Sequence, residues 1–217
     1  MAKPVETEFG CPNCGAPVRP PNLMHDGYLC PQHGEVPPLH SPLLPEPDHI
    51  TTLLGAAEVP AWIPWPLPTN WVFTGIRMVG GGPIPITAVA VGLTGAALNT
   101  GPADLVIIAE QPGTGLGARY SGITGQDPDP SMLANPPATH IHAAGWPTPL
   151  WSLPTEDDRA IYVGEASGEW LWLITWPELA WSVVHDDLRL IDLRTADRIT
   201  DLPVGAAMPR LRFPEGN

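Results

Sequence analysis

Proline and glycine set the first limit on what this chain can fold into. Thirty prolines and twenty-two glycines are spread over its 217 residues. A proline inside a helix removes a backbone hydrogen bond and clashes with the preceding turn, and glycine weakens a helix through its conformational freedom. Long helices are therefore excluded. Apolar residues make up 43% of the chain, which is enough for a real core. That core has to come mainly from short strands.

Short apolar runs separated by turn residues follow one another after residue 70. Ser167 and Gly168 lie between two such runs and predict a hairpin turn. The run "EWLWLITW" (169–176) is apolar on both alternating faces, which predicts a central strand buried on both sides. We expect a mainly β or α+β fold, with an antiparallel sheet arranged as a sandwich, a partial barrel or an α/β/α layer. The expected strands cover residues 71–79, 86–93, 103–111, 139–145, 159–166, 169–176 and 188–194.

Three cysteines and one histidine form the clearest chemical motif. Cys11 and Cys14 are separated by two residues, and so are Cys30 and His33, with fifteen residues between the pairs. Each pair begins a turn that proline restricts, and the glycine after the second ligand lets backbone amides point at sulfur. Two such knuckles face to face supply four soft or borderline ligands in a tetrahedron, which suits zinc. We expect these four residues to bind one structural zinc ion.

Other metal chemistries fit this motif less well. A rubredoxin-like iron site usually has four thiolates, and His33 argues against it. A catalytic zinc ion needs an open position, which four protein ligands do not leave. A redox or zinc-availability sensor that acts through the thiolates is a further hypothesis.

The chain divides into three expected segments. Residues 7–40 form the zinc ribbon, residues 41–58 a proline-rich linker with a short helix that Asp48 caps, and residues 59–213 the β-rich domain. Four prolines exclude residues 59–71 from the centre of a sheet. The three tryptophans of that stretch, Trp62, Trp65 and Trp71, are expected to lie against the β-rich domain.

Charge and hydropathy narrow the range of partners. The net charge is −13, and the first fifty residues carry six acids against two cations, Lys3 and Arg19. Nucleic acid is disfavoured as a partner because phosphate binding needs a positive surface, except at a local patch around Arg210 and Arg212.

No apolar run approaches the roughly 20 residues of a membrane helix, and no signal peptide is recognisable. Clustered thiols suit a reducing cytosol, so we expect a cytoplasmic protein that does not bind membranes.

A second candidate site lies in the β-rich domain. His140 and His142 stand two apart on an expected strand and therefore on one face, with Asp186 and Asp187 as possible carboxylate partners. Two ordinary histidines on a polar strand face are the simpler interpretation. The loop Gly113–Gly117 could act as a lid, with Arg119 and Tyr120 closing over a ligand. This loop lacks the lysine of a phosphate loop, and we expect it to be flexible or a bulged hairpin without a following helix.

The nine tryptophans of the chain are far more than usual, and those beside prolines differ from those within strands. Tryptophans beside prolines are the better candidates for a partner-facing surface, namely Trp62, Trp65, Trp146 and Trp151. The sequence contains no G-x-S-x-G motif, and its only cysteines belong to the ribbon. No catalytic residue is therefore assigned.

Several stretches resemble an uncharacterised actinobacterial family with an N-terminal zinc ribbon and a tryptophan-rich β domain. They are "CPNCG", "CPQHG", "VPAWIPWPLPTNWVFTG", "GLGARYSG", "PTPLW", "GEWLWLITWP" and "DDLRLIDLR". The resemblance implies the same layout but no activity. Some members carry an automatic label as phosphotransacetylases, which does not fit a chain this short and poor in helices. The segment "PLPTNW" (66–71) is also similar to the start of PsbP-type α/β/α domains.

The sequence favours a zinc-binding, non-catalytic cytoplasmic protein that acts as an interaction or assembly module, with another protein as its partner. The alternative is an enzyme or small-ligand binder whose site lies near His140, His142 and the Gly113–Gly117 loop.

Overall fold

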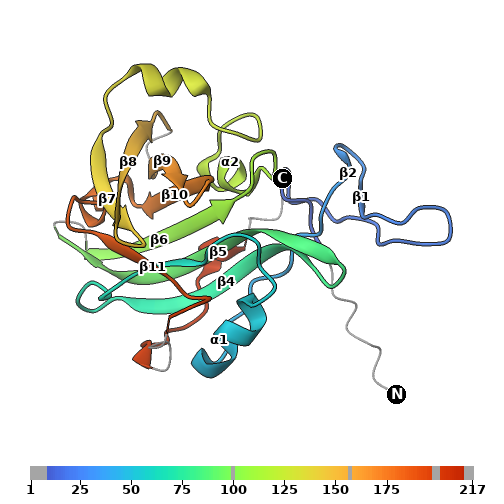
Figure 1. Cartoon of the computed structure of the whole chain (residues 1–217), viewed down its shortest axis with the longest axis horizontal. Helices are drawn as coiled ribbons and strands as arrows, with labels where there is room; N and C mark the ends of the chain where they lie inside the picture. Colours follow the sequence, from blue (N-terminus) through green and yellow to red (C-terminus); the bar gives the residue numbers. More distant parts are fainter. Residues whose placement is uncertain (1–8, 99–100, 156–157, 197–200, 213–217) are drawn as a thin grey trace.

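A curled sheet of nine strands dominates the computed structural model, which describes residues 9–98, 101–155, 158–196 and 201–212. The sheet wraps into a half-barrel, and a small two-stranded sheet projects from one side of it (Figure 1). The expected β-rich fold is confirmed, and of the three layouts left open it is the partial barrel. Of the predicted segments, residues 7–8, 99–100, 156–157, 197–200 and 213 lie outside the described residues.

The main sheet has the strand order β3-β11-β7-β8-β9-β10-β6-β5-β4. Neighbouring strands run antiparallel, except that β11 and β7 are parallel. The turn at Ser167 and Gly168 joins β9 to β10 as expected, and both residues have positive φ. The bounds are β3 Trp62–Pro64, β4 Val72–Gly81, β5 Ile84–Ala97, β6 Gly101–Glu110, β7 Thr139–Ala143, β8 Trp146–Leu153, β9 Ala160–Ala166, β10 Glu169–Trp176 and β11 Arg189–Asp192.

Strand β8 was not predicted, because Pro147 and Pro149 lie within it. The structure explains why the sheet accepts them. Along the proline-containing half, β8 pairs only with β7, and its pairing with β9 is confined to Trp151–Leu153. The missing N–H groups therefore interrupt no ladder of hydrogen bonds.

Apolar side chains fill both faces of the sheet. Strand β10 is buried on both sides as predicted, with Leu171 in the inner core of the half-barrel and Trp172 in the outer core. Helix α1 (Pro47–Leu54) contributes Ile50 and Leu54 to the inner core. The outer core lies under helix α2 (Leu116–Ser121) and the short 3-10 helices η1 (Pro130–Ala134) and η4 (Pro209–Leu211).

Two local expectations were wrong. Helix α1 is capped at Glu46 and not at Asp48, because Pro47 already supplies a backbone that favours the first helical position and leaves Asp48 within the first turn. The glycine-rich segment is not a flexible loop or a bulged hairpin: its residues Thr114–Ala118 are buried, and α2 begins within it at Leu116. The stretch after Pro177, left open as helix or strand, is the 3-10 helix η2 (Glu178–Val183).

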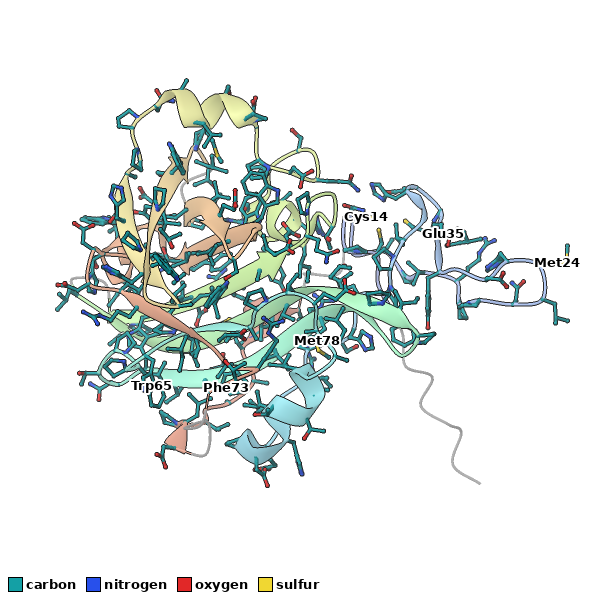
Figure 2. All side chains as sticks on the ribbon, in the orientation of Figure 1. Cys14, Met24, Glu35, Trp65, Phe73 and Met78 are labelled. Atoms are coloured by element: carbon teal, nitrogen blue, oxygen red, sulfur yellow. The ribbon has the colours of Figure 1, made fainter. Side chains whose placement is uncertain are left out.

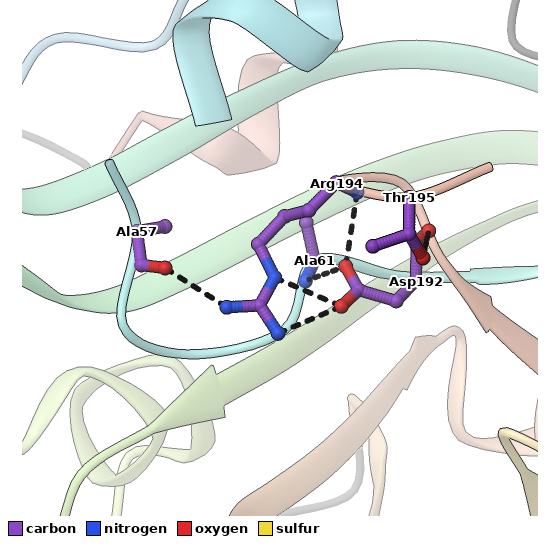
Figure 3. A network of polar contacts seen from close by, with 5 residues as sticks. All are labelled: Ala57, Ala61, Asp192, Arg194 and Thr195. Carbon is purple, nitrogen blue, oxygen red and sulfur yellow. Dashed lines mark hydrogen bonds and ion pairs between the residues drawn. The ribbon is translucent and has the colours of Figure 1, made fainter. Parts of the chain in front are cut away.

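A polar network fixes β11 against the chain that precedes β3 (Figure 3). Arg194 donates from Nη1 to the carbonyl of Ala57 at 2.8 Å, and its Nε and Nη2 both lie 2.8 Å from Asp192 Oδ2. Asp192 Oδ1 accepts hydrogen bonds from the amides of Ala61 and Arg194. This carboxylate therefore ties together two segments more than 100 residues apart in sequence.

None of the helices in the described part of the chain is long and apolar enough to cross a membrane.

Candidate metal centre

The cysteines and the histidine lie in two matching turns. Cys11 begins the first turn, whose closing amide, that of Gly15, donates to the Cys11 carbonyl at 2.8 Å. The second turn runs from Cys30 to Gly34 and joins β1 (Leu29–Cys30) to β2 (Gly34–Glu35). Gly15 and Gly34 occupy the same place after the second ligand of each turn, with φ of 75° and 72°. Only glycine adopts this left-handed backbone readily, which explains its repetition in the sequence.

These turns bring four ligand atoms together. The ligand atoms of Cys11, Cys14, Cys30 and His33 all lie within 4.8 Å of one another, and the group could hold a metal ion. Cys14 Sγ and Cys30 Sγ are 3.7 Å apart, and His33 Nδ1 lies 3.6 Å from Cys11 Sγ and 3.5 Å from Cys30 Sγ. The sulfurs are much farther apart than the roughly 2.05 Å of a disulfide. The three thiols are therefore free to act as ligands.

The pKa values of the two buried thiols, Cys11 and Cys30, are shifted in opposite directions. Burial raises the pKa of the Cys11 thiol to about 12, although the amides of Cys14 and Asn13 donate to it. Burial also acts to raise the pKa of Cys30, but the amide of Gln32, 3.4 Å from Sγ, and the His33 ring outweigh it and lower the pKa to about 6. Without a cation the cluster thus favours a thiolate at Cys30 and a proton on Cys11. A bound cation would displace that proton.

A short extended segment attaches the cluster to the main sheet. Gly10 and Leu39 exchange backbone hydrogen bonds of 2.9 and 2.8 Å. Residues 38–43 then follow the free edge of β4, where the His40 amide donates to Met78 and Leu43 exchanges hydrogen bonds with Ile76. The proline-rich segment therefore covers a sheet edge that would otherwise expose unpaired backbone groups.

One buried acid was missed by the sequence analysis. Glu110, at the end of β6, is 0% exposed and accepts hydrogen bonds from the amides of Leu116 at 2.7 Å and Gly117 at 3.1 Å. Burial raises its pKa to about 8, against the opposing effect of these two amides. A glutamate before a glycine-rich stretch looks like an exposed strand end, and nothing in the sequence indicated that α2 would cover it. The Glu110 carboxyl group thereby satisfies the first two amides of α2.

The histidine pair of the second candidate site lies on β7 as predicted. His140 is exposed and His142 half-buried, on either side of the fully buried Ile141. Asp186 is near, but its Oδ1 accepts from the Thr139 hydroxyl and from the His140 amide. Hydrogen bonding from Thr139 lowers the pKa of Asp186. Among the described residues these side chains do not join any group of three metal ligands.

Of the other predicted contact residues, some have different surroundings from those expected, whereas Trp146 is exposed as expected. Tyr120 cannot close over a ligand, because it is buried and its hydroxyl donates to the Leu211 carbonyl at 2.8 Å. Arg210 forms an ion pair with Asp104. Trp62 is buried and does not face a partner, whereas Trp146 is 76% exposed.

The chain belongs to the family DUF6758, a family of unknown function, whose model matches residues 5–211. This agrees with the resemblance inferred from the sequence. Comparison with curated proteins and with solved structures finds no match.

Proposed function

We propose that the chain is a zinc-binding, non-catalytic cytoplasmic protein whose ribbon contacts another protein. The single observation that carries the zinc assignment is the spacing of the four ligand atoms. With Zn–S bonds of about 2.3 Å and a Zn–N bond of about 2.0 Å, a tetrahedral site has S···S edges of ~3.8 Å and S···N edges of ~3.5 Å. The separations of 3.7, 3.6 and 3.5 Å match these edges.

The ligand set supports a structural ion. Four protein ligands fill a tetrahedral shell and leave no position for water or substrate. His33 in place of a fourth thiolate favours zinc over rubredoxin-like iron. Three free cysteines gathered in one cluster also suit a reducing compartment, which is why we place the protein in the cytoplasm.

A protruding turn supports the interaction role. Met24 lies at the outer tip of the ribbon, far from the half-barrel (Figure 2). Leu23 is fully exposed and Met24 is 90% exposed. The turn is nevertheless well ordered by hydrogen bonds, because Asn22 Oδ1 accepts from the Met24 amide at 2.8 Å and Asn22 Nδ2 lies 2.8 Å from His25 Nε2. Two apolar side chains on a preorganised turn form a surface that a partner can bind with little loss of conformational entropy.

Charge indicates the chemistry of that partner. The first fifty residues carry a negative excess, six acids against two cations. A basic protein surface with an apolar pocket complements such a ribbon, whereas nucleic acid would be repelled. The partner is therefore expected to be a protein.

Elemental mass spectrometry of natively purified protein tests the zinc assignment. We expect one zinc ion per chain, and none in a Cys11→Ser/Cys14→Ser variant. A chain without zinc, or with an equal amount of another metal, refutes the assignment.

The interaction role needs a separate comparison. In a crosslinking pull-down, a Leu23→Ser/Met24→Ser variant should keep its zinc and lose the partner that the wild type captures. Leu179→Ser is the matched control, since it removes a 62% exposed apolar side chain from η2, outside the ribbon, and should leave capture unchanged. Equal loss in both variants, or none in either, would contradict a role for the turn.

A further inference from the structure

A side chain of the first metal knuckle contacts the β-rich domain. Asn13 lies between Cys11 and Cys14, and its Oδ1 accepts a hydrogen bond from Gln126 Nε2 at 3.2 Å. The same oxygen lies against the backbone of Gly115, so closely that a Cβ atom on Gly115 would be 2.1 Å from it. We call Asn13, Gly115 and Gln126 the knuckle contact. Figure 2 places Cys14 on the side of the ribbon that faces the half-barrel, away from the tip at Met24.

The position of Asn13 depends on the metal-binding turn. Its backbone amide is one of the donors to Cys11 Sγ, so it belongs to the turn that a bound ion would hold. Apart from the backbone hydrogen bonds that Cys11 forms with Gly15 and Ala16, the ribbon gives this turn little support. Its strands β1 and β2 have two residues each, and the buried residues of its own core are Cys11, Val18, Cys30 and Val36. A unit this small depends on metal for its folded structure.

The other side of the contact is the start of α2. Gly115 has φ of 83° and precedes the helix directly. The next two amides, of Leu116 and Gly117, are the ones that hydrogen-bond the buried Glu110 carboxylate. Gly117 also packs so tightly that a Cβ atom there would be 2.3 Å from Trp172 Nε1. A displacement of Gly115 therefore moves the donors that stabilise a buried acid within the outer core.

We propose that occupancy of the Cys11–Cys14–Cys30–His33 site controls the order of the α2 turn through the knuckle contact. This inference rests on the proposed zinc site. Metal binding fixes the first knuckle and thereby seats Asn13 on Gly115, and metal loss removes this support. The β-rich domain thus senses the metal state of the ribbon across a contact that includes no metal ligand. By linkage, the support that metal gives to α2 equals the support that α2 gives to metal binding.

Hydrogen exchange with and without zinc tests the coupling. In the zinc-bound chain the amides of Leu116 and Gly117 should be protected, and removal of zinc by a chelator should speed their exchange on the order of tenfold, the usual size of a coupling between sites. Amides of β9, which do not touch the ribbon, serve as the internal reference. Zinc removal that deprotects residues 10–35 and leaves Leu116 and Gly117 unchanged would overturn the inference.

Two glycines offer a matched pair of variants. Gly113 and Gly115 both have φ of 83°, so alanine strains the backbone equally at either position. A Cβ atom at Gly113 meets nothing within 4 Å, whereas at Gly115 it collides with Asn13. Gly115→Ala should therefore speed zinc dissociation on the order of tenfold relative to Gly113→Ala. Equal dissociation rates in the two variants would argue against the contact.

Asn13→Ala provides the test if Gly115→Ala does not fold. This variant keeps all four ligands, and we expect it to bind one zinc ion while the exchange of Leu116 and Gly117 no longer responds to the chelator. A persistent response would show that the signal does not pass through Asn13 and would refute the proposal. A wild-type chain that binds no zinc overturns both the proposed function and this inference, whereas a zinc-bound chain without the response overturns only the inference.

Discussion

Stability should fall with increasing pH because of Glu110. Its carboxyl is 0% exposed and burial raises its pKa from 4.5 to about 8. The pKa is higher in the folded than in the unfolded chain, so the folded state binds the proton more tightly. The contribution of Glu110 to the free energy of unfolding is fully present below pH 4.5 and is lost as the pH rises through about 8.

The size of the effect follows from the shift. Each pKa unit corresponds to about 1.4 kcal/mol, so ionising Glu110 in the folded chain costs on the order of 4 to 5 kcal/mol in total. Between pH 6 and pH 8 the free energy of unfolding should drop by about 2 kcal/mol from this group alone. A change of that size is measurable, because domains are stable by only about 5–15 kcal/mol.

Urea unfolding at several pH values between 6 and 8, in excess zinc, measures how steeply the free energy of unfolding falls with pH. Glu110→Gln removes the titrating group, so its free energy of unfolding should vary about 2 kcal/mol less over this range than that of the wild type. The glutamine has one acceptor oxygen in place of two, so one of the amides of Leu116 and Gly117 loses its acceptor, but that loss does not depend on pH. Asp187→Asn is the control, because it removes the same charge from an exposed side chain and should keep the wild-type slope. Parallel slopes in wild type and Glu110→Gln would refute the argument.

Three further predictions follow from named contacts. Asp192→Ala should lower the free energy of unfolding by about 3 kcal/mol, because it removes the carboxylate that pairs with the Arg194 guanidinium and leaves the Ala61 amide without its acceptor. A loss below 1 kcal/mol in denaturant titration would contradict the role of the network in Figure 3. Trp172→Ala should lower the free energy of unfolding by about 4 kcal/mol, and Trp146→Ala by no more than about 0.5 kcal/mol, since Trp172 is fully buried and Trp146 is 76% exposed. Similar losses in denaturant titrations of the two variants would argue against the central position of β10. His140→Ala/His142→Ala should leave the zinc content at one ion per chain, and a loss of metal in elemental analysis would return the histidine pair to consideration as a site.

Local patterns in the sequence predicted much of this molecule. Alternating apolar residues identified β10 as a strand buried on both faces, because burial on both sides requires apolar residues at every position. The knuckle motif identified the four clustered residues, since the tight turn after the second ligand of each pair demands glycine. In both cases the information lies within a few neighbouring residues.

The features that the sequence did not reveal depend on how separate elements of the chain pack together. The prolines of β8 are acceptable only because β9 pairs with its other half. Glu110 is buried only because α2 covers it, and α2 itself has two glycines at its start and end that argue against a helix when read locally. Asn13 gives no sign of its contact with Gly115, more than 100 residues away. Such contacts are properties of the folded chain, and no local pattern encodes them.

The attachment of the ribbon to the sheet and its proposed metal-dependent contact with α2 use different residues. Its attachment to the sheet, the backbone pairing of residues 38–43 with β4, involves no metal ligand. Its contact with α2, in contrast, passes through a residue inside the ligand turn. Loss of metal would therefore release the knuckle contact while the edge pairing keeps the ribbon tethered, so that the metal can return to ligands held at high effective concentration. A reversible response to metal follows from this division between an anchor that needs no metal and a contact that does.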